Sequence, residues 1–253
     1  MPRVQTDGGE LRYETTGSGP TVAFVNDLSF GVWQWAFQQP ALAGPFETLA
    51  FDYRGAGDST GGPITRVAEF VDDLATVLAD HGARRVHLVG AGLGGMVALE
   101  YARQFGRARS LVLFGTTQSG DTIVNDAIET MCAQDESALD PCLDRETLES
   151  APEINAQIQH WRESDDATGR VRDGQLAAMK AYSLDRPYDI DQHALIVHGN
   201  ADPVVPVDAG RELAAALPRG TFEPIDGKHM ARIENAAHAN DLLVGFLESH
   251  ADL

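Results

Sequence analysis

The sequence has few cysteines and no long apolar run. Its two cysteines, Cys132 and Cys142, stand without a C-x-x-C motif and without histidines at ligand spacing among 253 residues. This pattern argues against a disulfide scaffold and against a zinc site. No run approaches the roughly 20 apolar residues that a membrane span needs, and the first residues lead directly into polar sequence. We therefore expect a cytoplasmic protein with no membrane partner.

Positive charge is also scarce. The chain has 19 Lys and Arg against 38 Asp and Glu, a net charge of −19, and only Lys180 and Lys228 are lysines. Such a field repels nucleic acids and anionic lipid headgroups, so neither is an expected partner. Many acids with few lysines favour a halophilic protein, because the screening length falls to ~3 Å at 1 M salt and such a net charge then becomes tolerable. A high-GC genome is the alternative explanation.

Short β-rich apolar runs alternate with helix-period stretches, which predicts an α/β fold with a mostly parallel sheet covered by helices on both faces. Strands are expected at residues 10–16 (an edge strand), 21–26, 48–54, 85–89, 109–114, 194–198 and 221–225. Helices are expected at 65–81, 96–105, 208–217 and 235–250. The first helix has apolar residues every three or four positions and a closing glycine, Gly82.

The alternation stops between residues 120 and 188, where polar, acidic helical stretches follow one another. We interpret this segment as a helical cap inserted into the sheet domain. The predicted organisation is therefore an α/β core at 1–119 and 189–253, with the cap at 120–188.

Three segments place polar groups or glycines after predicted strands. Residues 86–96 (VHLVGAGLGGM) form a strand, a glycine-rich turn and the start of a helix. Asp202 follows the strand at 194–198, and His229 lies in the loop after the last strand. The chain order of turn, acid and histidine is that of the α/β-hydrolases, in which a G-x-S-x-G elbow precedes the acid and the histidine.

From residue 10 to residue 247 the chain resembles an α/β-hydrolase, and most of all the 3-oxoadipate enol-lactonase subgroup. The resemblance rests on residues 25–29 (VNDLS), on the pair Trp33 and Trp35, and on residues 51–59 (FDYRGAGDS). In that subgroup an N-S-L-G stretch and a D-x-R-G-x-G-x-S loop occupy these places. The match is weakest in the cap.

The resemblance implies catalytic roles for Asp202 and His229, but it puts the nucleophile position on Gly92, which has no attacking oxygen. Glycine tolerates the backbone angles of an elbow, which cost other residues about 1–3 kcal/mol, so the turn is expected to survive. The amides of Leu28 and Leu93 are the expected oxyanion-hole donors.

Asn26, Asp27, Trp33 and Trp35 are pocket candidates. Asp27 stands where the subgroup carries serine, and a carboxylate beside an oxyanion hole disfavours an anionic intermediate unless it is protonated or turned outward. The interpretation that we favour from sequence is a solvated loop acid.

A second motif competes with the elbow. Gly90, Gly92 and Gly95 match the dinucleotide-binding pattern G-x-G-x-x-G after a strand. Two or three strands precede it, however, and no acid follows about 20 residues later, so a dinucleotide-binding protein is a remote alternative.

The sequence therefore predicts a hydrolase that acts on small carbonyl substrates, a carboxylic ester or an enol-lactone, with a His–Asp pair and no serine nucleophile. Two alternatives stay open: a catalytically silent hydrolase fold that binds a small molecule or a protein, and an engineered Ser-to-Gly variant. We expect no metal and no organic cofactor. We also expect slow turnover, because an oxyanion hole and substrate binding alone retain a rate only ~10³–10⁴-fold above that of the reaction in water. Gly92→Ser is expected to raise esterase activity at least about a hundredfold.

Overall fold

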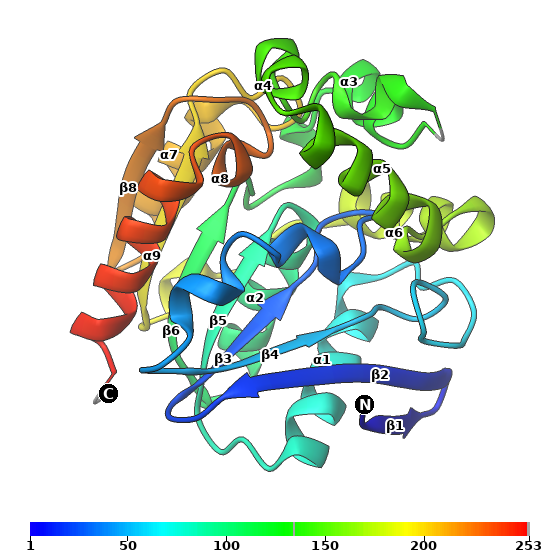
Figure 1. Ribbon diagram of the computed structural model, residues 1–253. Helices are drawn as coiled ribbons and strands as arrows, with labels where there is room; N and C mark the ends of the chain where they lie inside the picture. The colour runs from blue at the N-terminus through cyan, green and yellow to red at the C-terminus, as the bar shows by residue number, and fades with distance from the viewer. Residues whose placement is uncertain (134, 252–253) are drawn as a thin grey trace.

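The computed structural model describes residues 1–133 and 135–251. Eight strands form one sheet in the order β1-β2-β4-β3-β5-β6-β7-β8 (Figure 1). Only the β1–β2 and β2–β4 pairs are antiparallel, and the other five are parallel. The strands are β1 (Arg3–Thr6), β2 (Gly9–Gly17), β3 (Thr21–Val25), β4 (Glu47–Phe51), β5 (Val86–Ala91), β6 (Ala108–Phe114), β7 (His193–Gly199) and β8 (Gly220–Ile225). The predicted mostly parallel α/β sheet is confirmed.

The prediction of an edge strand at residues 10–16 is wrong. β2 has a neighbour on each side, because β1 pairs with it from Arg3 opposite Arg12 to Thr6 opposite Gly9. β1 is short and no residue of it is fully buried. Such a strand has no apolar alternation from which it could be predicted.

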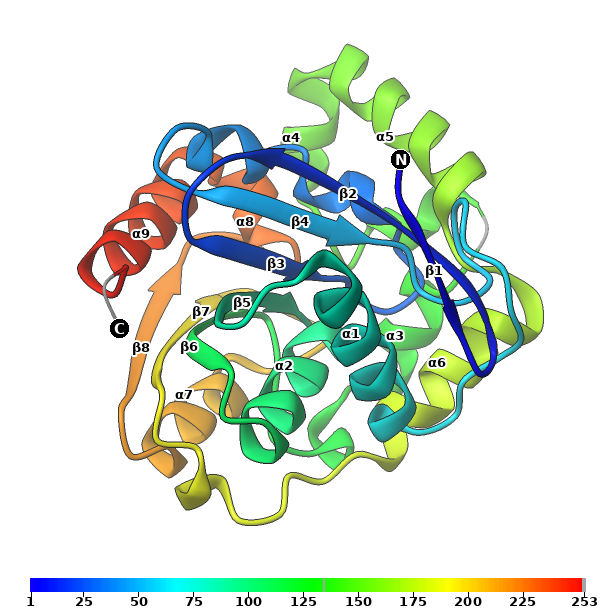
Figure 2. The same cartoon turned by 90° about the horizontal axis from the view of Figure 1, so that it is seen from below.

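Helices cover both faces of the sheet (Figure 2). They are α1 (Val67–His81), α2 (Leu93–Gln104), α3 (Asn125–Met131), α4 (Arg145–Ser150), α5 (Pro152–Asp165), α6 (Gly169–Ala181), α7 (Val207–Ala216), α8 (Ala231–Glu234) and α9 (Ala236–Ser249). Short 3-10 helices are η1 (Val32–Trp35), η2 (Gln39–Leu42), η3 (Gly120–Thr122), η4 (Glu136–Leu139) and η5 (Pro187–Asp189).

Alternation along the buried strands divides the core into two layers. In β3, Ala23 and Val25 belong to the apolar cluster that includes α1, α2 and α7, whereas Val22 and Phe24 belong to the cluster that includes α9. This follows from the period of two in a strand, which sends successive side chains to opposite faces. The predicted apolar stripe of α1 is buried, and Gly82 ends the helix in the left-handed conformation with φ of 86°.

The segment between β6 and β7 forms the inserted helical cap. Its described residues contain α3 to α6 and no strand beyond an isolated bridge between Ser119 and Ser183. Figure 1 shows these helices over the end of the sheet to which the parallel strands point. Loops that follow parallel strands meet at this end, which is where ligands bind in open α/β sheets. No helix within residues 1–133 and 135–251 is long and apolar enough to cross a bilayer.

Candidate active site

The glycine-rich turn joins β5 to α2 as predicted, although α2 begins at Leu93, three residues before the expected start. Gly92 has φ of 46° and ψ of −113°, a conformation that residues with a side chain rarely adopt. Gly94 allows close packing, since a Cβ on it would lie 2.1 Å from the carbonyl oxygen of Val25. The turn therefore has the sharp geometry of a nucleophile elbow, with no side chain at its apex.

The carboxylate of Asp27 occupies the space that a side chain on Gly92 would need. A Cβ added to Gly92 would lie 1.8 Å from Asp27 Oδ1, well inside van der Waals contact. Asp27 Oδ1 accepts hydrogen bonds from the backbone amides of Leu28 (2.6 Å) and Leu93 (3.0 Å). The two amides expected to hold an oxyanion thus converge on one point, and an oxygen of the protein's own carboxylate fills it.

The interpretation of Asp27 as a solvated loop acid is wrong, because its side chain is fully buried. Asp27 is the second residue after β3, and its backbone amide donates to Gln34 Oε1 at 3.3 Å. One signal in the sequence could have pointed to this: an acid, Asp27, stands beside the oxyanion loop, and the apex of the elbow, Gly92, has no side chain. A sequence pattern does not reveal that the two positions share the same space.

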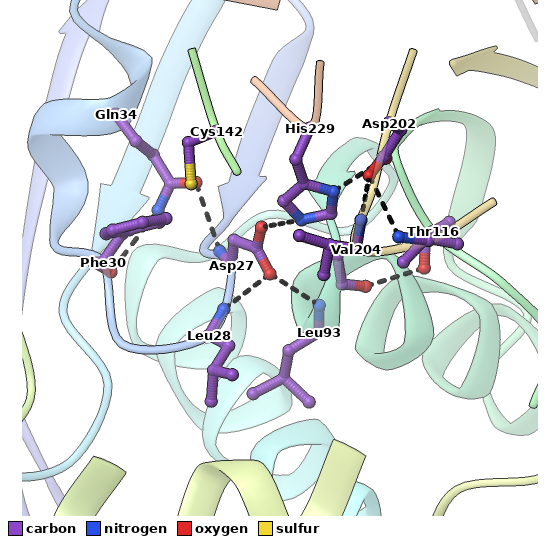
Figure 3. Close-up of polar contacts among 12 residues, drawn as sticks. Asp27, Leu28, Phe30, Gln34, Leu93, Thr116, Cys142, Asp202, Val204 and His229 are labelled. Atoms are coloured by element: carbon purple, nitrogen blue, oxygen red, sulfur yellow. Dashed lines mark hydrogen bonds and ion pairs between the residues drawn. The ribbon is translucent and has the colours of Figure 1, made fainter. Parts of the chain in front are cut away.

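His229 lies between two carboxylates. Its Nδ1 is 2.8 Å from Asp202 Oδ2, and its Nε2 is 3.0 Å from Asp27 Oδ2 (Figure 3). Asp202 Oδ1 also accepts hydrogen bonds from the backbone amides of Val204 and Val205, which hold the carboxylate in place in the loop after β7. The structure thus brings together Asp202, His229 and the apex of the elbow, from loops after three different strands.

His198 adds a further contact to this group. Its side chain is fully buried in β7. Its Nε2 lies 2.8 Å from the carbonyl oxygen of Val205 and 3.2 Å from Asp202 Oδ2. His198 is therefore a positioning residue for Asp202 rather than a group that faces the elbow.

Charge pairing determines the protonation state of the site. Burial by itself would lower the pKa of His229, but the charges and hydrogen bonds of Asp202 and Asp27 raise it to about 10. Burial would raise the pKa of Asp27 and of Asp202, but the charge of His229 brings both below their usual value. At neutral pH the site therefore holds an imidazolium between two carboxylates, and His229 can accept no further proton while both charges remain.

A buried arginine, Arg232 in α8, is the functional-site residue that the sequence analysis missed. Its side chain is 1 % exposed, donates from Nη2 to Gln34 Oε1 at 2.7 Å and lies 4.9 Å above the ring of Trp35. Burial lowers its pKa to about 10, against the opposing effect of the Asp27 charge. With Arg232, two cations balance the two carboxylates. In the sequence it is an ordinary arginine in a C-terminal loop.

Three pocket candidates have structural contacts. Asn26 donates to the carbonyl oxygen of Phe51 and accepts from Trp35 Nε1 at 2.9 Å. Trp33 Nε1 donates to Asp166 Oδ1 at 2.7 Å. None of the three is among the residues that line the cavity described next.

A cavity of about 390 Å³ lies between the oxyanion loop and the cap, and its lining includes Ser29, Cys132, Arg162, Asp166 and Thr168. Ser29 is two residues from Asp27 and has φ of 63°, and its amide donates to Gln175 Oε1 of α6 at 2.7 Å. The cap also covers the histidine, because the His229 amide donates to the carbonyl oxygen of Pro141 at 3.4 Å. Asp27 and His229 are therefore enclosed by the protein, and neither of them lines this cavity.

Cys132 and Cys142 are both free and buried. Among residues 1–133 and 135–251, no group of three or more His, Cys, Asp or Glu side chains could hold a metal ion. The dinucleotide pattern has a different use here, since the Leu93 amide at the start of α2 already binds the Asp27 carboxylate. A diphosphate could reach that helix end only by displacing this charge.

A parallel sheet, an elbow between β5 and α2, and an acid and a histidine after later strands define the α/β-hydrolase class. The chain belongs to the alpha/beta hydrolase fold family, whose model matches residues 24–236.

Its relatives are distant hydrolases and related enzymes. RutD from Agrobacterium fabrum, whose name describes a carbamate hydrolase, is 26 % identical over 94 % of this chain and 97 % of its own length. 3-Oxoadipate enol-lactonase 1 from Acinetobacter baylyi is 23 % identical over 97 % of this chain and 92 % of its own. The enol-lactonase structure from Burkholderia xenovorans superimposes with a TM-score of 0.85 at 24 % identity, covering 98 % of this chain and 100 % of that one.

Proposed function

We propose that the protein is a hydrolase of small carbonyl compounds, carboxylic esters or enol-lactones, that works without a serine nucleophile. One observation carries this proposal: the amides of Leu28 and Leu93 and the imidazole of His229 all point at a single carboxylate above Gly92. Two converging amides favour an oxygen that carries negative charge, and the imidazole can move a proton beside it.

For this reaction the Asp27 side chain turns away, and the substrate carbonyl oxygen takes the place of Oδ1 between the two amides. Removing that carboxylate from His229 Nε2 also removes one of the two charges that keep the imidazole protonated. The pKa of His229 then falls, and the neutral ring, oriented by Asp202, can take a proton from a water that attacks the carbonyl carbon. This water takes the place of Asp27 Oδ2, within hydrogen-bond distance of His229 Nε2.

The test compares the unmodified protein with His229→Ala on a panel of p-nitrophenyl esters and enol-lactones in high salt. His238→Ala is the matched control, because His238 is exposed on α9. We expect slow hydrolysis that His238→Ala keeps and His229→Ala loses. Equal rates in all three proteins would remove the proposal.

A second candidate, a catalytically silent fold that binds a small molecule, is favoured by a different observation. The protein's own carboxylate fills the oxyanion position, and both Asp27 and His229 are buried beneath the cap. Ligand binding in the adjacent cavity without turnover of any ester would support this candidate.

The fit between positions 27 and 92 argues against the engineered-variant alternative. A serine at position 92 and the observed Asp27 carboxylate exclude each other, so Gly92 and Asp27 form a matched pair. A laboratory change at position 92 alone would not supply the acid at position 27.

A further inference from the structure

We propose that Asp27 is itself a nucleophile, and that with it the protein opens strained cyclic ethers, epoxides, to diols through an aspartyl ester. This activity goes beyond ester hydrolysis. It uses the same group of residues but leaves Asp27 in place instead of moving it aside.

The first argument is position. The Asp27 carboxylate stands where a side chain on Gly92 would stand, with Oδ1 held by two amides and Oδ2 3.0 Å from His229 Nε2. It is fully buried, and its pKa is lowered by the charge of His229 despite the opposing effect of burial. A desolvated, oriented carboxylate is one of the side chains that form covalent intermediates in enzymes.

The second argument selects the electrophile. Attack on a carbonyl carbon would create a new oxyanion, but both available amides are already bonded to Oδ1. Attack of Oδ2 on a tetrahedral ring carbon creates no oxyanion on that carbon, and Oδ1 becomes the ester carbonyl oxygen between the same amides. The geometry therefore suits a saturated carbon with a leaving group.

The third argument concerns the leaving atom. The ring oxygen departs as an alkoxide and needs a proton, and His229 holds one at neutral pH because its pKa is about 10. In the first step the bond from Oδ2 to carbon forms, the ring C–O bond breaks, and the Nε2 proton passes to the alkoxide. A halide would leave without a proton and would make no use of this acid.

The second step regenerates the carboxylate. Esterification removes the negative charge of Asp27, so His229, now neutral and paired only with Asp202, can accept a proton from water. The water oxygen bonds to Asp27 Cγ, and the oxyanion develops on Oδ1 against the Leu28 and Leu93 amides. Collapse of this tetrahedral adduct breaks the ester bond, and the departing alkoxide takes the proton of the carboxylic acid that has just formed on Asp27. Epoxide and water give one diol, and Asp27 keeps one oxygen from the water.

The experiment uses styrene oxide as the probe in heavy-oxygen water, with the full chain and a reaction run for many turnovers. We expect diol formation, and we expect the peptide that contains Asp27 to gain heavy oxygen only when styrene oxide is present. This readout needs no variant, so it does not depend on a variant's folding. In His229→Gln, which lacks both the acid of the first step and the base of the second, neither the diol nor heavy oxygen in Asp27 should appear.

Asp27→Ala gives the opposite results for the two proposals. It should abolish diol formation, yet raise ester hydrolysis, because it frees the two amides. The control is Asp80→Asn, which changes an exposed acid at the far end of α1 and should alter neither activity. Two outcomes overturn the role of Asp27 as a nucleophile and leave the hydrolase proposal intact. One is diol formation without heavy oxygen in Asp27, and the other is the absence of both diol and heavy oxygen in Asp27 while esters are hydrolysed. Loss of ester hydrolysis alone, with label still entering Asp27, overturns the hydrolase proposal instead.

Discussion

Placing a serine at position 92 tests whether Asp27 and Gly92 exclude each other. A Cβ there would lie 1.8 Å from Oδ1 and 2.3 Å from Cγ of Asp27, so the carboxylate must move. Moving it breaks hydrogen bonds from two amides and separates it from His229. The sequence-based expectation, that Gly92→Ser alone restores esterase activity, therefore needs revision.

The size of the effect follows from these contacts. A hydrogen bond to a charged group contributes about 1.5–3 kcal/mol, and a left-handed non-glycine residue costs about 1–3 kcal/mol. We expect Gly92→Ser to lower the free energy of unfolding by about 4 kcal/mol and to raise p-nitrophenyl esterase activity less than about tenfold. The double variant Asp27→Ala/Gly92→Ser keeps only the backbone strain, and we expect it to gain at least about a hundredfold in esterase activity.

Urea unfolding and initial rates on p-nitrophenyl acetate, measured in the same high-salt buffer, give both quantities. Asp27→Ala alone is the matched control, because it frees the amides without adding a hydroxyl. If Gly92→Ser alone is as stable as the unmodified protein and as active as the double variant, the carboxylate does not hold the place above the elbow.

Three further predictions concern the charges and contacts around the site. The pKa of His229 in the folded protein is raised from 6.5 to about 10, so its stabilising contribution is complete below about pH 6.5 and is lost as pH rises through 10. Urea unfolding across this range should show a declining free energy of unfolding, and His229→Gln should remove this pH dependence. Arg232→Met leaves two buried carboxylates with one cation, so unfolding should become easier by about 3–5 kcal/mol, and unchanged stability would refute the charge balance. Gln175→Ala removes the acceptor of the Ser29 amide and should cost about 1–3 kcal/mol in urea unfolding, and unchanged stability would show that this hydrogen bond does not hold the loop.

The sequence alone predicted the mostly parallel sheet, its helical cover and the cap, since these depend on local periodicity and chain order. It also predicted the elbow at residues 90–94, because glycine spacing after an apolar strand is a short-range signal. Short-range signals failed where they are weak, as for β1, which has no fully buried residue.

Only the tertiary structure decided what the site contains. Asp27, Gly92 and His229 come from three separate loops, and no pattern in the sequence states that a carboxylate from the first fills the space left empty by the second. The same holds for Arg232, which is an ordinary loop cation in the sequence until α8 places it against the ring of Trp35. Burial fixes the charge states of these groups, because desolvation and pairing depend on distances between segments that are far apart in the chain.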